Sequence, residues 1–336
     1  MKKKIVFITK ASTNDGIGHL QRTVRLARNL NKKKFDLFII GIKKEYINYL
    51  DKKLFKEINF IKNDCQLKID YLKFEKKINS DLCIIDLPKP NIKLEKKLYQ
   101  NKTNFLVYDN LSRKKIYSNY LVNLNPVIKK SSYKKVLSYN KCEFLLGVNY
   151  FQFNEKKTIN KKIKEIKNIL LFFGGGKINY NLIHKVSKNI SKLNLKKIKI
   201  IFISKIKIDK KKKNYLKNRY NLNFSFFHNL RSINNILKKI DLAIVTSGSI
   251  SFEASFFKVP MILVSVAKNQ INIAKSWSKM GAAIYIGNEK VANFSEKLAK
   301  GLNKILKVKN RSKMYNIQQR IYKDYQNKLI ETLNKI

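Results

Sequence analysis

Short apolar runs alternate with amphipathic stretches along almost the whole 336-residue chain. The first run, Ile5–Thr9, is followed by a stretch in which Leu20, Val24 and Ala27 fall on one face of a helix. Buried parallel strands give such short apolar runs, and the crossover between two parallel strands is usually a helix. The sequence therefore predicts an α/β protein with doubly wound parallel sheets. The strands predicted from these runs are 5–9, 36–40, 81–86, 104–109, 169–173, 199–203, 223–227, 241–246 and 261–264.

The alternation occurs twice, which predicts two domains. Residues 154–167 are polar and rich in lysine, and they separate an N-terminal domain, 1–155, from a C-terminal domain, 165–307. Each half is long enough to form its own core. Residues 308–336 carry apolar side chains three to four positions apart, which predicts one long amphipathic helix. That helix would either pack across the domain junction or form a dimer contact, so the oligomeric state stays open.

The net charge of +51, from 73 Lys and Arg against 22 Asp and Glu, is the unusual feature of the composition. Such a charge ordinarily suggests a nucleic acid, an anionic membrane or another polyanion as partner. Most of the excess is lysine on polar helix faces and in loops, as in 205–217, and it does not interleave with aromatic residues as a stacking platform would. A biased composition at tolerant surface positions explains it better, and we predict no specific nucleic-acid partner.

Cysteine content and hydropathy bear on the compartment. Cys65, Cys83 and Cys142 are far apart in the sequence and indicate neither a disulfide framework nor a zinc site. No apolar run approaches the roughly 20 residues of a membrane span, and the first run is too short for the core of a signal peptide. We expect a cytoplasmic protein.

The first candidate site lies between the first strand and the first helix, where open α/β sheets bind ligands. Gly16 and Gly18 allow the backbone to approach a ligand, the helix N-terminus offers free amides to an anion, and His19 adds a titratable base. The structural alternative is a helix-capping loop with an incidental surface histidine. His184 and His228 fall in a helical pattern and after a strand, so His19 is the histidine predicted for catalysis.

The second half repeats this logic. Residues 174–176 form a glycine turn directly after a strand, followed by Lys177, and we predict a phosphate cradle there, with a plain tight turn as the alternative. Residues 247–249 end a later strand and cap the next helix. Glu253, one turn into that helix, would accept bonds from a ribose diol or simply complement the helix dipole.

Two adjacent amides, Asn269 and Gln270, open the helix after the following strand. An amide side chain both donates and accepts, which suits sugar hydroxyls and acetamido groups. A polar helix start would account for the pair alone. We favour a ligand site because the glycine turn, the hydroxyl turn, the acid and the amides fall on one edge of one sheet.

Together these motifs resemble those of the UDP-sugar hydrolases of pseudaminic acid biosynthesis and of their relatives in spore-coat polysaccharide biosynthesis. Those proteins are built on the glycosyltransferase-B fold of the lipid II N-acetylglucosaminyltransferase. The resemblance covers most of the chain up to about residue 290. The matching residues are 16–22, 84–86, 108–109, 123–125, Gly147 with Tyr150, Gly174 with Gly175, and the run 247–287.

The resemblance implies two Rossmann-like domains facing a cleft. It implies that uridine diphosphate lies against the second domain and that His19 takes a proton from water attacking the anomeric carbon of the sugar. No metal or other cofactor is then required. The residues expected to bind the UDP-sugar are Gly16, Gly18, Arg22, Asp109, Gly174, Gly175, Gly176, Ser247, Gly248, Ser249, Glu253, Asn269 and Gln270.

Three positions depart from the family's pattern. Residues 86–88, Asp-Leu-Pro, lack the tyrosine that usually follows the aspartate, Asn154 stands in place of an arginine, and residues 176–177 stand in place of Thr-Asp. These positions surround the sugar donor and the attacking group. The identity of the sugar and of the nucleophile therefore stays open.

Three functions follow from the sequence. The leading one is a hydrolase that releases UDP and a free acetamido sugar for nonulosonic acid or surface polysaccharide synthesis. The alternative is a glycosyltransferase that passes the sugar to an acceptor at or near the membrane, with the basic surface making a peripheral contact with anionic lipid. A non-catalytic binder of polyanions is suggested only by the charge, and it leaves His19 and the glycine turns without a role.

Overall fold

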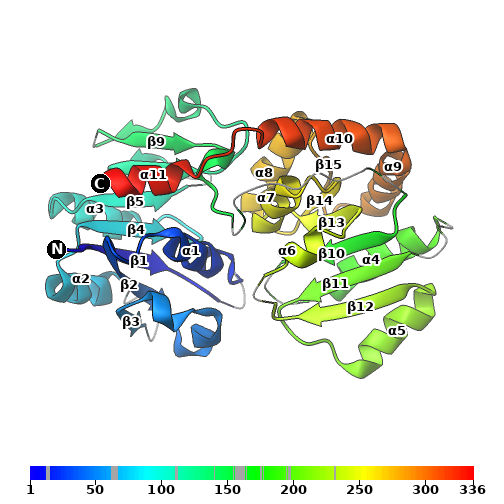
Figure 1. The fold of residues 1–336 in the computed structure, drawn as a ribbon, viewed down its shortest axis with the longest axis horizontal. Helices are drawn as coiled ribbons and strands as arrows, with labels where there is room; N and C mark the ends of the chain where they lie inside the picture. The colour runs from blue at the N-terminus through cyan, green and yellow to red at the C-terminus, as the bar shows by residue number, and fades with distance from the viewer. Residues whose placement is uncertain are drawn as a thin grey trace. The chain divides into compact units, whose positions relative to one another are not determined.

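The structure is a computed structural model. It describes residues 1–12, 16–61, 67–109, 113–139, 141–153, 155, 163, 165–174, 176, 178–193, 195, 198–230 and 232–336. The chain divides into two compact units (Figure 1), which we call unit 1, Met1–Asn154 with Gln326–Ile336, and unit 2, Glu155–Tyr325.

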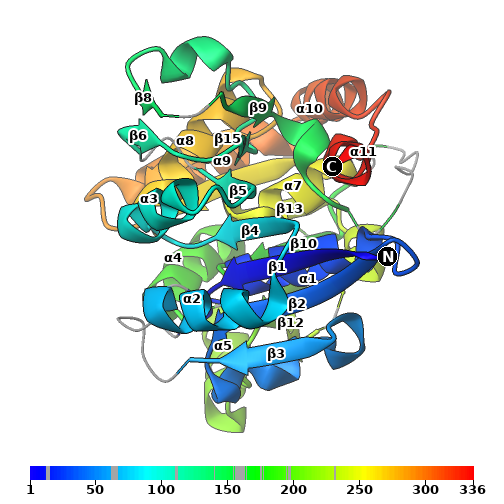
Figure 2. The ribbon, with the colours of Figure 1, turned by 90° about the vertical axis from the view of Figure 1, so that its left-hand side faces the viewer.

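Unit 1 is built on a seven-stranded sheet in the order β3-β2-β1-β4-β5-β7-β9, whose paired strands are all parallel (Figure 2). Helices α2 and α3 bury one face, and α1 contacts β1 and β4. The strands are β1 (Lys3–Thr9), β2 (Phe35–Ile42), β3 (Glu57–Phe60), β4 (Leu82–Asp86), β5 (Phe105–Tyr108), β7 (Tyr120–Asn123) and β9 (Glu143–Leu146), with β6 (Lys115–Ile116) and β8 (Leu137–Ser138) forming a separate pair. The helices are α1 (Gly18–Asn29), α2 (Leu67–Ile78), α3 (Ile92–Gln100) and α11 (Lys328–Lys335), with 3-10 turns η1 (Lys44–Tyr49), η2 (Lys52–Leu54), η4 (Lys130–Tyr133) and η5 (Val148–Tyr150).

Unit 2 is built on a six-stranded parallel sheet in the order β12-β11-β10-β13-β14-β15. Apolar side chains of α4, α5 and α9 pack against one face of it in a single core. The strands are β10 (Asn168–Phe172), β11 (Lys199–Ser204), β12 (Asn223–His228), β13 (Leu242–Thr246), β14 (Met261–Ser265) and β15 (Ile284–Asn288). The helices are α4 (Tyr180–Ser191), α5 (Lys210–Tyr220), α6 (Asn234–Leu237), α7 (Ser249–Phe256), α8 (Lys268–Lys279), α9 (Phe294–Leu306) and α10 (Val308–Ile321).

Both sheets have a topological switch point. In unit 1 the chain winds outward from β1 to β3, then returns to the other side of β1 at β4; in unit 2 it does the same from β10 to β12 and returns at β13. Open parallel sheets bind ligands where the carboxyl ends of two such strands diverge. Ligand sites are therefore expected at the carboxyl ends of β1 and β4 and at those of β10 and β13.

The prediction of doubly wound α/β sheets is confirmed, and every predicted strand overlaps an observed one. The prediction of a single C-terminal helix is wrong. Helix α10 ends at Ile321, and α11 starts after Asn327, whose side chain accepts a hydrogen bond from the backbone N of Ile330. The apolar stripe serves two cores, because α10 belongs to unit 2 whereas Leu329 and Leu333 are buried in unit 1.

Candidate active site

His19 lies in the first turn of α1, directly after the loop that follows β1. Its Nδ1 is 2.6 Å from Oδ1 of Asp86, the last residue of β4, and the side chains are 11% and 1% exposed. The two residues are far apart in the sequence and meet because β1 and β4 are neighbours in register, with Thr9 opposite Asp86. The pair therefore sits at the switch point of unit 1.

Asp86 also holds Arg22, which lies one turn after His19 on α1. Nε of Arg22 donates to Oδ2 of Asp86 at 2.6 Å, and a terminal nitrogen donates to Oδ1 at 2.5 Å. Burial by itself would raise the pKa of Asp86, but the charges of Arg22 and His19 and their hydrogen bonds outweigh it and lower the pKa to about 2. Asp86 is therefore ionised at neutral pH.

The charge of Asp86 determines the tautomer of neutral His19. An ionised carboxylate only accepts hydrogen bonds, so the short contact requires the proton on Nδ1 of the imidazole. Nε2 then carries the lone pair and is the basic nitrogen. This carboxylate–imidazole arrangement is the one that orients a general base in many hydrolytic enzymes.

The glycines of the first motif shape the entry to α1. Gly16 has φ of 74° and exchanges backbone hydrogen bonds with Ser12, while the structure shows open space around an added Cβ at Gly18. Ile17 occupies the N-cap position without a side-chain cap, so no cap side chain covers the first amides of α1. Residues 13–15, which precede Gly16, lie outside the described residues.

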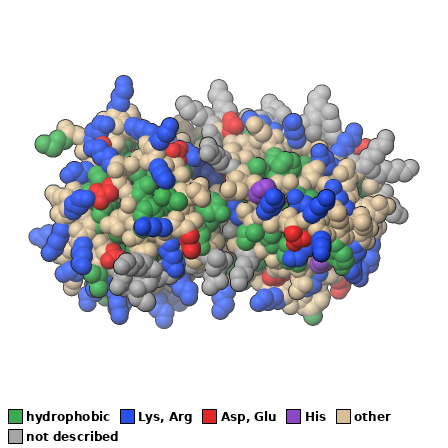
Figure 3. All heavy atoms as spheres, turned by 90° about the horizontal axis from the view of Figure 1, so that it is seen from below, with side chains coloured by type: hydrophobic (Ala, Val, Ile, Leu, Met, Phe, Trp, Pro, Cys, Tyr) green, Lys and Arg blue, Asp and Glu red, His purple; other side chains and the backbone are tan. Residues whose placement is uncertain are grey.

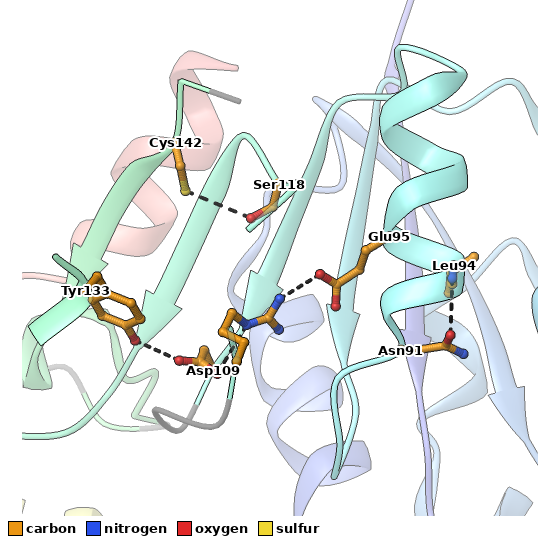
Figure 4. Close-up of polar contacts among 8 residues, drawn as sticks. Asn91, Leu94, Glu95, Asp109, Ser118, Tyr133 and Cys142 are labelled. Atoms are coloured by element: carbon orange, nitrogen blue, oxygen red, sulfur yellow. Dashed lines mark hydrogen bonds and ion pairs between the residues drawn. The ribbon is translucent and has the colours of Figure 1, made fainter. Parts of the chain in front are cut away.

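Asp109 lies on the other face of the sheet. It follows Tyr108 at the end of β5, and the alternation of side chains along a strand turns it away from the face that carries Asp86. Its carboxylate accepts from Nε of Arg113 at 3.1 Å and from the hydroxyl of Tyr133 at 2.8 Å (Figure 4). With its side chain fully buried in this network, Asp109 has a structural environment, and its assignment to substrate binding stays a prediction.

The same network contains a second buried carboxylate. A terminal nitrogen of Arg113 donates to Glu95 on α3 at 2.6 Å, and burial raises the pKa of Glu95. The network connects α3 to the loop after β5 and to η4.

In unit 2, the predicted glycine and hydroxyl turns follow β10 and β13 at the switch point. Gly174 adopts φ of 103°, and an added Cβ would lie 4.0 Å from Oγ1 of Thr246, the last residue of β13. Gly176 is half-buried in this turn, whereas Gly175 and Lys177 lie outside the described residues.

The hydroxyl turn, Ser247 to Ser249, opens helix α7. Gly248 occupies the N-cap position without a side-chain cap, and Ser249 is the first helical residue. Ser247 instead donates to the carbonyl oxygen of Gln270 at 2.8 Å, which ties the end of β13 to the start of α8. No cap side chain accepts from the first amides of α7, the position at which helices can bind anions.

The side chains of Gln270, Asn269 and Glu253 have different environments. The Oε1 of Gln270 accepts from the backbone N of Val266 at 2.9 Å, which leaves its NH₂ group as the donor, and Asn269 is exposed. Glu253 is half-buried on α7. Lys205, directly after β11, lies close enough for the two charges to interact; burial lowers the pKa of this lysine to about 8 against the opposing effect of Glu253.

Asp86 and Lys205 are candidate functional residues that the sequence analysis did not assign. Each stands at the carboxyl end of a buried parallel strand, β4 or directly after β11, and this position is the signal that could have identified them. In a doubly wound sheet, polar residues at the carboxyl ends of the strands next to the first strand indicate a ligand site as well as glycine turns do.

Other features of the described chain bear on the remaining predictions. No group of three His, Cys, Asp or Glu that could hold a metal ion occurs among the residues the structure describes. None of the helices in those residues is both long enough and apolar enough to cross a membrane. Lys and Arg side chains are distributed over the face seen in Figure 3 and do not gather in a single patch.

Two doubly wound units define the glycosyltransferase-B type of fold, and solved structures agree. MurG of Acinetobacter baumannii matches with a TM-score of 0.67 and 12% identity over 99% of this chain and 100% of that chain. A glycosyltransferase of Rickettsia africae matches at 0.64 and 14% identity, over 99% and 97%. The spinosyn rhamnosyltransferase SpnG, solved with thymidine diphosphate, matches at 0.62 and 10% identity, over 99% and 100%. At these identities the likeness concerns the fold.

Sequence comparison finds one family match, which lies almost entirely in unit 2, and one relative matched over most of the chain. Residues 169–329 match the Glycosyltransferase family 28 C-terminal domain. The uncharacterized protein MJ1062 of Methanocaldococcus jannaschii is 29% identical over 279 residues, which cover 78% of this chain. The chain spans about half the length of that relative, since the match covers 55% of it.

Proposed function

We propose that the protein is a nucleotide-sugar hydrolase that splits a UDP-sugar into UDP and a free acetamido sugar. The observation that carries the proposal is the His19–Asp86 pair at the switch point of unit 1, with a contact of 2.6 Å. It is supported by the resemblance of residues 16–22 and 247–287 to UDP-sugar hydrolases. The match of residues 169–329 to the Glycosyltransferase family 28 C-terminal domain supports a nucleotide-sugar as the ligand.

In the proposed reaction, Nε2 of His19 takes a proton from water as the water oxygen attacks the anomeric carbon of the sugar. The bond between that carbon and the β-phosphate oxygen breaks, and UDP leaves with the electron pair. Asp86 keeps the proton on Nδ1 and stabilises the imidazolium that forms. General base catalysis of this kind typically raises a rate by about 10²- to 10⁴-fold.

Unit 2 supplies groups suited to a nucleoside diphosphate. The turn at Gly174 and the uncapped start of α7 offer backbone amides to phosphate oxygens, and Glu253 is an acceptor for a ribose diol. We propose that Asn269 and the NH₂ group of Gln270 contact the sugar.

The test is to incubate the protein with UDP-2,4-diacetamido sugars and with UDP-N-acetylglucosamine, without an acceptor, and to follow UDP release. His19→Ala is expected to lower the rate by at least about 100-fold. The matched control is His184→Ala, because His184 lies on α4 and its Nδ1 is 3.0 Å from the hydroxyl of Tyr220. Release at the same rate in both variants would contradict the proposal.

A second candidate is a glycosyltransferase, favoured by the match of residues 169–329 to a glycosyltransferase family. In this reaction an acceptor hydroxyl takes the place of water, and His19 removes its proton in the same way. The same experiment separates the two: binding of the UDP-sugar without release of UDP identifies the transferase, and addition of an acceptor then restores release.

A further inference from the structure

Three polar side chains form a row beneath α1 at the carboxyl edge of the sheet in unit 1. Thr9 pairs in register with Asp86, and the pairing of Ile85 with Val107 places Asp86 beside Tyr108. Side chains at one register position point to the same face of a sheet. Asp86, the residue that holds His19, is therefore flanked by Thr9 and Tyr108 on its own face.

Tyr108 uses its ring and not its hydroxyl. The guanidinium carbon of Arg22 lies 4.5 Å from the centroid of the Tyr108 ring. The hydroxyl of Tyr108 is buried and has no hydrogen-bond partner among the residues that the structure describes, and the same is true of the hydroxyl of Thr9. Burial raises the pKa of Tyr108, so the phenol stays neutral. The contact that Tyr108 makes in this row is thus the stacking of its ring on a cation.

Arg22 is held from two sides. Its guanidinium group donates hydrogen bonds to both carboxylate oxygens of Asp86, and the guanidinium carbon lies over the ring of Tyr108. A terminal nitrogen of Arg22 also lies 3.2 Å from Nδ1 of His19. A carboxylate that accepts hydrogen bonds at both oxygens cannot rotate freely, so the oxygen that contacts His19 stays in place.

We propose that Arg22 and Tyr108 are positioning residues for His19: the Tyr108 ring orients the Arg22 fork, the fork fixes the Asp86 carboxylate, and Asp86 fixes the imidazole. This assigns Arg22 a role different from the substrate contact expected from the sequence. The inference deepens the proposed function and rests on it for the role of His19 as a base; the geometry of the chain of contacts does not depend on the substrate.

The test compares Tyr108→Leu with Tyr108→Phe in the full-length protein. Leucine removes the aromatic face, whereas phenylalanine keeps the face and removes only the unpartnered hydroxyl. Imidazole ¹⁵N chemical shifts at neutral pH report the tautomer of each histidine without any substrate, and His19→Ala assigns the signals of His19 among the three histidines.

We expect the wild type and Tyr108→Phe to show a single His19 tautomer with the proton on Nδ1, and Tyr108→Leu to show a mixture. In the UDP-release assay, Tyr108→Leu should lower kcat by roughly 10- to 100-fold with KM little changed, because a misplaced base affects the chemical step. Since the tautomer is read without substrate, an inactive wild type would count against the hydrolase and leave the positioning test intact.

Arg22→Lys provides the second variant, in case Tyr108→Leu does not fold. Lysine keeps the charge and loses the planar fork, so a mixed His19 tautomer is again expected. A pure Nδ1 tautomer in either folded variant, Tyr108→Leu or Arg22→Lys, would overturn the proposal.

Discussion

Asp86 keeps its negative charge in a place where burial alone would favour the neutral acid. Two partners on a single helix turn, Arg22 and His19, reverse that preference. The sequence pattern indicated His19 from its position directly after Gly16 and Gly18, but it could not show Asp86 as its partner. Periodicity reveals strands and not which strands are neighbours, so a site assembled from the ends of β1 and β4 becomes visible only with the sheet order.

The first prediction concerns the charge of Asp86. Asp86→Asn keeps the size of the side chain and loses the charge that selects the tautomer of His19, so kcat for UDP release should fall by about 10²- to 10⁴-fold. Asp81→Asn is the matched control, because Asp81 lies just before the opposite end of β4 and contacts the backbone N of Lys4 at 2.7 Å. More than a third of wild-type activity in Asp86→Asn would contradict a role in catalysis.

The lowered pKa of Asp86 also predicts how the stability of the protein depends on pH. Its folded pKa of about 2 lies below the unfolded value of about 4, so the charge contributes stability above pH 4 that is lost as the pH falls toward 2. That contribution is about 2 kcal/mol at neutral pH. In urea unfolding, the difference in free energy between the wild type and Asp86→Asn should shrink as the pH falls from 4 toward 2; a difference that holds unchanged down to pH 3 would refute it.

At the scale of elements, most of the buried strands were predictable from their apolar runs, whereas β3, β7, β9 and β15 were not. Most residues of β3, β9 and β15 are only half-buried, so the pairing of the sheet and not local sequence determines them. The C-terminal segment shows the same limit. Its apolar spacing is helical throughout, yet the stripe is divided between two cores at residues 322–327.

Helix α11 should contribute to the stability of unit 1. Leu333 is 1% exposed, and α11 contacts η5 within that unit. Leu333→Ala is expected to lower the free energy of unfolding by about 2–4 kcal/mol, as for other buried leucines. Asn334→Ala, an exposed neighbour on the same helix, should change it by less than about 0.5 kcal/mol. Equal effects of the two substitutions in urea unfolding would show that α11 does not pack as described.

At the scale of the whole molecule, the charge of +51 favours any anionic ligand without specifying one. The distribution of Lys and Arg in Figure 3 fits a general surface property, and long-range attraction is screened within about 10 Å at 0.1 M salt. We predict that raising NaCl from 50 to 500 mM increases KM for the UDP-sugar by roughly two- to ten-fold. The value of kcat should stay nearly constant, because Asp86 is buried and His19 and Arg22 are largely so. A KM independent of salt would show that the surface charge plays no part in substrate capture.

The central claim is that His19, oriented by Asp86, activates water to attack the anomeric carbon of a UDP-sugar. The most direct measurement is UDP release in H₂¹⁸O without an acceptor, followed by mass spectrometry of the UDP. Cleavage between the anomeric carbon and oxygen predicts that UDP is released unlabelled and that release is lost in His19→Ala. Label in the β-phosphate of UDP would place the attack at phosphorus, and that result, or release unaffected by His19→Ala, would contradict the account.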